Sequence, residues 1–365
     1  MKTFTFRPAP GSRGASKGEN VTTVTIKDVA REAGVSVASV SRALNGSGGV
    51  TAETEQRIRA VANRLRYVPH SAARSLITRR THTIGALLPD LYGEFFSELI
   101  RGIDLAARAR GLHLLVSSAH DGVEEAAAAL RAMRGRVDGM LILSSRADQK
   151  FLHANLPEGL PTVLLNSAVR SRHYSVLNID NEGGARAMVR HLVDAGHRQI
   201  AFITGPDGNF DAAQREHGYR AAMAEFAPDT PVRVVAGEFT EESGYRAGRE
   251  LLATGTRPQA VFAGNDMMAI GCLYAFQEAG LDVPRDIALA GFDDIPITRY
   301  VTPALTTVRV RIVDLGRSAL ERLAALLETS DQTIAPSADT LGCEVVVRDS
   351  CGASPHSKSS TKKAR

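Results

Sequence analysis

Residues 25–46 read TIKDVAREAGVSVASVSRALNG, and this stretch decides what the N-terminal part of the chain forms. Thr25 precedes an amphipathic run and Asp28 follows three residues later, which is the spacing of a capping box at a helix start. Gly34 supplies the permissive backbone that a tight turn between helices requires. Ser36 is placed to cap a second helix. The stretch therefore predicts two short helices joined by a turn.

A third helix is expected after Thr51, which is a capping residue. Its inner face carries Ile58, Val61, Ala62 and Leu65. Ala30, Gly34 and Val40, at steps of four and six, form the packing skeleton of a helix-turn-helix. A three-helix bundle without DNA-binding function would have the same caps and the same glycine turn, so the skeleton alone leaves both possibilities open.

The second helix offers a surface that can read DNA. When Val40 and Leu44 pack inward, the outward side chains are Val37, Ala38, Ser41 and Arg42. The N-terminal residues of such a helix would meet base edges in the major groove. Val37 and Ala38 can touch thymine methyl groups, and Arg42 can pair with guanine or hold a phosphate. Ser36, Thr51 and Thr54 lie near helix N-termini, where they can donate hydrogen bonds to phosphate oxygens.

Charge is distributed unevenly along the 365 residues, whose formal net charge is +4. Residues 21–80 hold ten Lys and Arg against four Asp and Glu, whereas residues 81–350 hold 26 against 35. A basic head on an acidic body indicates that the head binds a polyanion. The Ser-, Gly- and Lys-rich ends, 1–20 and 350–365, are expected to be disordered.

Composition argues against several classes of protein. No apolar run reaches the length of about eighteen residues that a membrane span needs, and the first twenty residues lack the apolar segment of a signal peptide. Cys272, Cys343 and Cys351 do not have the spacing of a metal site or a disulfide framework. We expect a cytoplasmic protein with no membrane partner, associated with the nucleoid.

From Thr83 onward, short apolar runs alternate with amphipathic stretches. Ten runs between residues 83 and 310 are continuously apolar or β-branched, which is typical of strands buried on both faces. Strand–helix alternation predicts parallel, doubly wound sheets. Ten strands are many for one such sheet, so we expect two sheets with a cleft between them.

Polar residues follow these runs, at the strand ends where open α/β sheets bind ligands. They are Asn166, Asp180, Asn265, Asp266, Asp293 and Asp294, with Arg215 at a helix start. Carboxylates, amides and a guanidinium suit the hydroxyl groups of a sugar. In an alternative interpretation, Asp180, Asp266 and Asp294 cap the helices that follow them.

No sequence motif for catalysis occurs in the body, so we expect neither an enzyme nor a cofactor nor a metal site. Asp211, Arg215 and His217 stand close together in the sequence, but no nucleophile accompanies them. We interpret them as an ordinary polar helix start.

The chain resembles the LacI/GalR family of bacterial transcription regulators. The head carries the resemblance in TIKDVAREAGVSVASVSRALNG, IRAVANRLRYVPH and SAARSL, and the body in NDMMAIGCLYAFQEAGLDVPRDIALAGFDD and GFDDIPITRYVTPALTTVRV. It extends from residue 24 to about residue 349. It implies a regulator, with repression favoured, that acts as a homodimer or tetramer on a near-palindromic operator in double-stranded DNA.

The resemblance also implies particular residue roles. In the family the connector folds into a hinge helix on DNA, and a leucine enters the minor groove. That residue is Leu76 here, with Ala72 and Ala73 as its small neighbours. Thr25 and Tyr67 join the implied DNA contacts. The implied effector site consists of Phe95, Phe96, Asn166, Arg215, Phe239, Asn265 and Asp293.

The expected fold is an all-α helix-turn-helix head with a hinge helix, followed by a periplasmic-binding-protein-like α/β core. The predicted segments are a basic extension (1–20), the head (21–69), the hinge (70–81), the core (82–349) and a basic tail (350–365). Within the core we expect an N-subdomain (about 82–180 plus 311–340) and a C-subdomain (about 181–309 plus 341–349).

Three functional hypotheses stay open on these grounds. The first is a repressor whose operator affinity depends on a mono- or disaccharide between the subdomains. The second replaces the sugar with a purine or another metabolite. The third is a sugar-binding protein without DNA function, which the basic head and the missing signal peptide disfavour.

Overall fold

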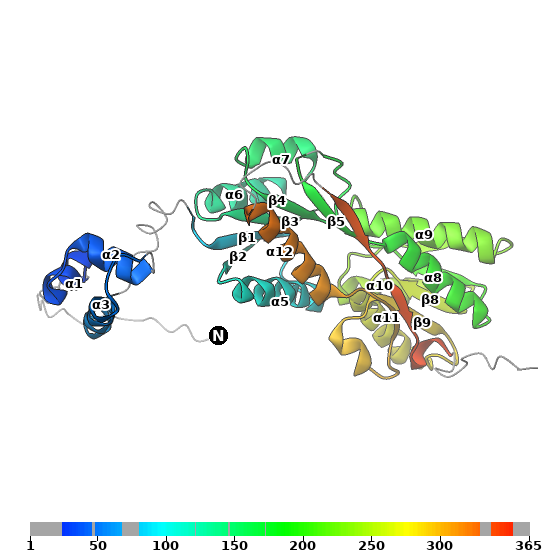
Figure 1. Ribbon diagram of the computed structural model, residues 1–365. Coiled ribbons are helices and arrows are strands. Elements are labelled where there is room, and N and C mark those ends of the chain that lie inside the picture. The colour runs from blue at the N-terminus through cyan, green and yellow to red at the C-terminus, as the bar shows by residue number, and fades with distance from the viewer. Residues whose placement is uncertain are drawn as a thin grey trace, which may run out of the picture. The chain divides into compact units, whose positions relative to one another are not determined.

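The computed structural model describes residues 24–45, 48–67, 80–120, 122–144, 147–171, 173–328 and 337–352. Contacts divide the chain into two units, Met1–Arg79 and Arg80–Arg365. We call them the head and the core (Figure 1).

The head contains the three expected helices, α1 (Ile26–Ala33), α2 (Val37–Asn45) and α3 (Ala52–Arg64). They enclose a small apolar cluster of Val29, Ala30, Ala33, Val40, Ala43, Ile58, Val61 and Ala62. Gly34 ends α1 with φ 65°, a left-handed conformation that glycine adopts without a steric penalty. The Arg59 guanidinium donates to the Ala43 carbonyl (3.2 Å) and ties α3 to α2.

Two sheets form the core, as predicted, and each has six strands. The first has the order β11-β5-β4-β3-β1-β2 and the second β12-β10-β9-β8-β6-β7. The strands of the first are β1 (Thr83–Leu88), β2 (His113–Ser118), β3 (Gly139–Leu143), β4 (Thr162–Leu165), β5 (Ser175–Ile179) and β11 (Ala338–Leu341). Those of the second are β6 (Ile200–Ile203), β7 (Arg233–Val235), β8 (Ala260–Ala263), β9 (Ala288–Asp293), β10 (Thr306–Arg309) and β12 (Glu344–Val346).

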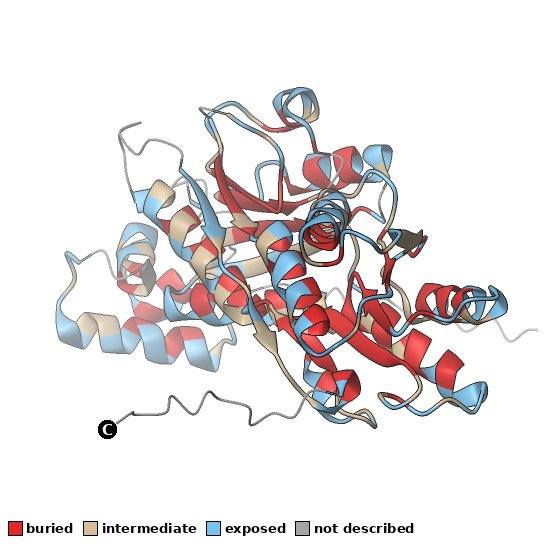
Figure 2. Cartoon of the chain, turned by 90° about the vertical axis from the view of Figure 1, so that its right-hand side faces the viewer, coloured by how far each residue is buried: buried red, intermediate tan, exposed pale blue. Residues whose placement is uncertain are grey.

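Helices cover both faces of each sheet (Figure 1). The first sheet packs between α5 (Glu94–Ala109) with α12 (Ile312–Glu328) and α6 (Val123–Met133) with α7 (Gln149–Asn155). The second packs between α8 (Asn181–Asp194) with α9 (Phe210–Phe226) and α10 (Glu241–Ala253) with α11 (Asp266–Glu278). Burial is concentrated on the strands and on the helix faces that meet them (Figure 2). We call the two layered units the N-lobe and the C-lobe.

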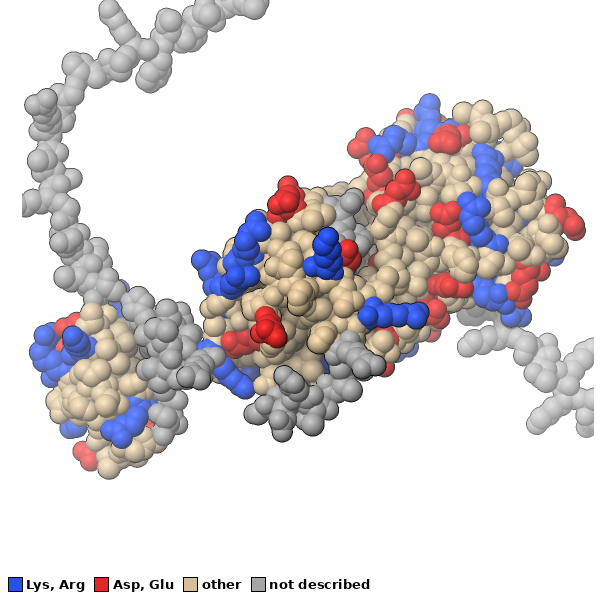
Figure 3. Space-filling model, turned by 90° about the horizontal axis from the view of Figure 1, so that it is seen from above, with Lys and Arg blue, Asp and Glu red and all other residues tan. Residues whose placement is uncertain are grey.

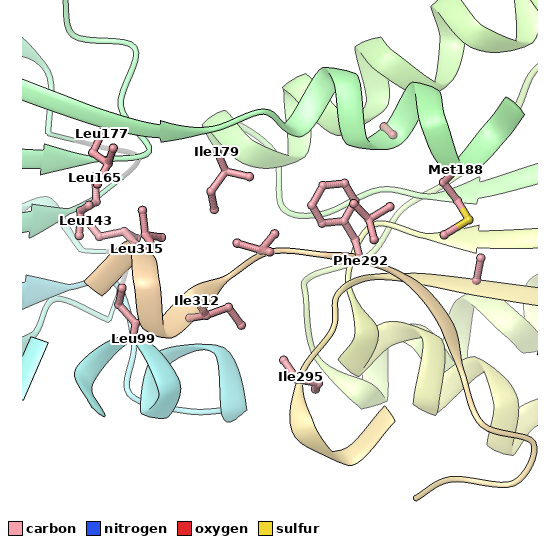
Figure 4. Packing of buried hydrophobic residues seen from close by; sticks show 14 of the residues in the cluster. Leu99, Leu143, Leu165, Leu177, Ile179, Met188, Phe292, Ile295, Ile312 and Leu315 are labelled. Atoms are coloured by element: carbon pink, nitrogen blue, oxygen red, sulfur yellow. The ribbon is translucent and has the colours of Figure 1, made fainter. Parts of the chain in front are cut away.

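Three crossovers join the lobes, from β5 to α8, from β10 to α12 and from β11 to β12. The apolar core is continuous through this region. Figure 4 shows Ile179, Phe292, Ile295 and Ile312 between the two sheets, and all four are almost fully buried in one cluster. Because apolar side chains link the lobes here, a change in their arrangement must repack this cluster.

All ten predicted strands are present, but β11, β12 and α7 were not among the elements that the apolar runs and amphipathic stretches indicated. β11 is an edge strand whose sequence, ADTL, is largely exposed, so it has no apolar signature. β12 pairs antiparallel with β10, whereas every other strand pair is parallel among the described residues. None of the described helices could span a membrane.

Candidate functional site

The exposed face of α2 has the character that the sequence predicts. Val37 is 41% exposed, which is high for an apolar side chain, and Ala38 and Arg42 are exposed beside it. Ser41 is half-buried. The Arg42 Nε donates to the Ala38 carbonyl (3.4 Å), so the guanidinium lies back along the helix. Basic side chains lie on several sides of the head in the view of Figure 3.

The capping predictions are confirmed. The Asp28 carboxylate accepts from both the backbone N (3.0 Å) and the Oγ1 (2.7 Å) of Thr25. The Ser36 Oγ accepts from the Ser39 N (3.1 Å), and the Thr51 Oγ1 accepts from the Thr54 N (3.3 Å). These bonds fix the starts of three helices. The remaining backbone N–H groups at these starts can donate hydrogen bonds to phosphate oxygens.

Two further predictions concern the end of the head and the connector. Tyr67 is half-buried against the head cluster, and burial raises the pKa of its phenol. Ala72, Ala73 and Leu76 lie outside the described residues, as do the basic extension and most of the basic tail.

In the core, Arg215 on α9 is the centre of a buried polar cluster. Its Nε donates to the Asn181 Oδ1 (2.8 Å) and its Nη1 to the Gly264 carbonyl (2.6 Å). Its Nη2 lies 3.0 Å from the Asp293 Oδ1, and its guanidinium stacks 3.9 Å from the centre of the Phe292 ring. Since Arg215 is only 3% exposed, these partners compensate for its lost hydration.

Asp293 ends β9 in a positive-φ conformation (115°), which turns its side chain toward Arg215. Burial raises the pKa of this carboxyl to about 6, although the Arg215 charge opposes the shift. Its buried Oδ1 lies 3.0 Å from the Arg215 Nη2 and has no other partner among the described residues. A buried acceptor of this kind is suited to a hydroxyl or N–H donor from a ligand.

Asn166 belongs to the N-lobe and joins the polar cluster by a hydrogen bond to the C-lobe. Its Nδ2 donates to the Asp211 Oδ2 (3.1 Å) on α9, while the Asn181 Nδ2 donates to the Asp211 Oδ1 (2.7 Å). Burial raises the pKa of Asp211 despite the nearby Arg215. A hydrogen bond therefore links the end of β4 in one lobe to the first turn of α9 in the other.

Hydrogen bonds elsewhere among the described residues also cross between the lobes. The Tyr92 hydroxyl donates to the Glu241 carboxylate (3.1 Å), and the Ile297 backbone N donates to the Glu94 Oε2 (2.9 Å). With the Asn166–Asp211 bond, these contacts hold the lobes together around the polar cluster.

Asn265 and Phe239 contact each other and the polar cluster from the C-lobe. The Asn265 Oδ1 caps α11 by accepting from the Met268 N (2.9 Å), and its Nδ2 donates to the Phe239 carbonyl (3.0 Å). Phe239 has φ 61°, and its ring centre lies 5.7 Å from the Arg215 guanidinium. A Cβ at Gly205 would come within 2.3 Å of this ring, so only glycine leaves it room.

The structure thus joins five of the seven predicted effector residues, namely Asn166, Arg215, Phe239, Asn265 and Asp293. Phe95 and Phe96 instead contact each other edge to face (5.5 Å) and pack against the apolar cluster. Asn181 was not among the predicted members, and Asp211 was interpreted as part of an ordinary polar helix start. The available signal was their position, since each directly follows a strand or opens the next helix.

The three aspartates for which a capping role was proposed behave differently. Asp180 caps α8 by accepting from the Gly183 N (3.0 Å). Asp266 is buried and accepts from Thr307 and Ile295, and burial raises its pKa well above the usual value. Asp294 pairs with Arg309 (2.6 Å) and Arg348 and its pKa is lowered. All three side chains are therefore structural. His217 is exposed and contacts Glu182 (3.2 Å).

A helix-turn-helix head and a two-lobed core with a polar cluster between the lobes define a ligand-responsive DNA-binding regulator. Two family models match the chain: bacterial regulatory proteins of the lacI family over residues 25–70, and the periplasmic binding protein-like domain over residues 189–351.

The ribose operon repressor of Escherichia coli K12 is 37% identical over 82% of this chain and 92% of its own length. Catabolite control protein A of Priestia megaterium is 34% identical over 85% of this chain and 95% of its own length. The repressor PurR of Escherichia coli O1:K1 is 38% identical over 82% of this chain and 89% of its own length. A Lac repressor dimer bound to operator and the anti-inducer ONPF superimposes with a TM-score of 0.82 at 28% identity, covering 91% of this chain and 100% of that one.

The chain belongs to the LacI family. It is a DNA-binding transcriptional repressor regulated by a small-molecule effector, and its fold and relatives are those of repressors rather than enzymes.

Proposed function

We propose that the effector of this repressor is a mono- or disaccharide held between the lobes by Asn166, Arg215, Asn265 and Asp293 over the Phe239 ring. The observation that carries the proposal is the Asp293 Oδ1, a buried acceptor whose one partner among the described residues is Arg215. A carboxylate oxygen can accept a second hydrogen bond, which a sugar hydroxyl supplies, and the hydroxyl oxygen accepts in turn from neighbouring amide or guanidinium N–H groups.

The charge of the cluster is consistent with a neutral ligand. Arg215 faces two carboxylates, Asp211 and Asp293, and its described hydrogen bonds are to protein groups. An anionic effector would meet a net negative site, which low polarity around the cluster makes more repulsive. A related regulator from Enterococcus faecium has been solved with bound ribose, at 26% identity.

We infer that two chains act together on a near-palindromic operator. One small head makes few phosphate contacts, whereas two heads on joined cores read two half-sites with combined affinity. The Lac repressor neighbour is a dimer on its operator. The effector alters operator affinity to the extent that it binds one arrangement of the lobes better than the other.

A thermal-shift screen tests the effector class. Sugars and nucleobases are added to the full-length protein, and the cognate ligand raises the melting temperature by an amount that grows with the logarithm of 1 + [L]/Kd, where [L] is the free ligand concentration. A nucleobase that stabilises the protein while every sugar fails would replace the sugar with a purine as the proposed effector.

Effector affinity is expected to fall as the pH drops through about 6, by up to tenfold per pH unit, because the ionised Asp293 is the better acceptor. The contribution of this carboxyl to folding has the opposite sign. Its pKa is raised in the folded state, so the stability it adds at low pH is lost as the pH rises through about 6. Titration calorimetry across this range measures the affinity. An affinity that does not change with pH would exclude Asp293 as an acceptor.

Gly205→Ala is expected to weaken effector binding about tenfold, because the new methyl group would displace the Phe239 ring. Gly255→Ala is the matched control, since its added Cβ meets open space. Equal effector affinity for the two variants would remove Phe239 from the site.

A further inference from the structure

A cavity of about 320 Å³ lies in the core away from the Arg215 cluster. Its walls come from three places: Glu98 and Arg101 on α5, the segment from Asp294 to Tyr300, and the β10–α12 crossover. The cavity therefore touches the N-lobe, the C-lobe and one of the three connections between them. Its volume is within the range of small-molecule sites.

Four arginines line this cavity: Arg101, Arg299, Arg309 and Arg311. Arg101 pairs with Glu98 (2.9 Å), and Arg309 pairs with Asp294 (2.6 Å). Arg299 and Arg311 are different. Each makes only one long ion contact, 3.8 Å to Asp294 and 3.8 Å to Glu344 respectively, among the described residues. Two guanidinium groups with uncommitted N–H donors thus stand at the wall of a cavity.

The nearby carboxylates do not cancel this charge. Asp294 is already held by Arg309 and Arg348, Glu98 by Arg101, and Asp314 by Arg317. Guanidinium groups match the geometry of phosphate oxygens and bind them with charge-assisted hydrogen bonds. We propose that this cavity binds a small phosphate compound through Arg299 and Arg311.

The position of the cavity also gives its ligand a route to the effector site. Asp293 and Asp294 are consecutive at the end of β9, and both have positive φ (115° and 56°). Asp293 contacts Arg215 in the polar cluster, whereas Asp294 lines the cavity and holds Arg309. A phosphate that draws Arg299 and Arg311 together acts on the same backbone turn that orients the effector-binding carboxylate.

Titration calorimetry on the full-length protein tests the site, with inorganic phosphate and glycerol 2-phosphate as separate probes at constant ionic strength in chloride. The double variant R299Q/R311Q is expected to bind at least tenfold more weakly than wild type. The control R108Q/R285Q removes two exposed charges outside the cavity, Arg108 paired with Asp104 and Arg285 paired with Asp282 and Asp286, and is expected to bind like wild type. If inorganic phosphate binds more tightly than glycerol 2-phosphate, the ligand is the free ion. If glycerol 2-phosphate binds more tightly, the ligand is an organic phosphate.

Amide hydrogen exchange locates the bound anion. Phosphate is expected to slow exchange at residues 294–300 and 309–314 in the wild type and not in R299Q/R311Q. Binding that is equal in wild type and R299Q/R311Q, protection confined to the basic head, or no binding of either probe would each overturn the proposal. None of these results depends on the effector, so the sugar proposal stands or fails separately.

Discussion

Asp293→Asn is expected to abolish the response of DNA binding to the effector while leaving operator affinity without effector unchanged. Asparagine keeps the shape of the side chain and an acceptor oxygen but removes the charge, so each hydrogen bond that a ligand donates to it loses about 1–1.5 kcal/mol, the difference between a charged and a neutral acceptor. Two such bonds amount to roughly a 30- to 100-fold loss of effector affinity. Binding of the protein to a fragment of its own promoter, with and without the ligand from the screen, measures both quantities.

Asp282→Asn is the control, because Asp282 is an exposed carboxylate paired with Arg285 (3.0 Å) outside the polar cluster. This variant should respond to the effector as the wild type does. Normal induction in the Asp293 variant would place the effector elsewhere.

Arg42→Ala is expected to weaken operator binding by roughly 10- to 100-fold per head, the cost of about 1–3 kcal/mol that a lost bidentate base contact carries. Effector affinity should not change, since Arg42 lies in the head. The measurement is an operator titration at several salt concentrations, because affinity for DNA falls steeply with salt.

Arg31→Ala separates base contact from general charge. Arg31 is exposed on α1 and pairs with Asp28 (2.5 Å). An equal loss in the two variants would show that Arg42 contributes only charge, and undiminished binding by the Arg42 variant would exclude it as a contact. A protein lacking residues 1–80 should lose operator binding altogether.

The head was predictable in detail because its signals are local. A cap and its partner stand three residues apart, as Thr25 with Asp28 and Ser36 with Ser39 do, so spacing in the sequence becomes contact in the helix. The strands of the core were predictable for a similar reason, since strands buried on both faces are continuously apolar. β11 escaped this rule because it is polar and exposed, and takes its partner β5 from more than 150 residues away.

The candidate effector site was predictable only as a set of strand ends. Asn166, Arg215, Asn265 and Asp293 could be named, but the partners of each could not. Asn181 bonds to both Arg215 and Asp211, and Asn166 reaches Asp211 from the other lobe. Those contacts depend on how two sheets and their crossovers stack.

The amino-acid pattern alone determined the helical head, the alternating α/β core and the residues that end its strands, because each follows from periodicity and capping over a few neighbours. Folding in three dimensions decided which polar groups share a buried network and that the Asp293 carboxylate is buried beside Arg215. It also decided where an arginine-lined cavity opens between the lobes. These features arise from contacts between segments far apart in the chain, whose distances and desolvation no local pattern encodes.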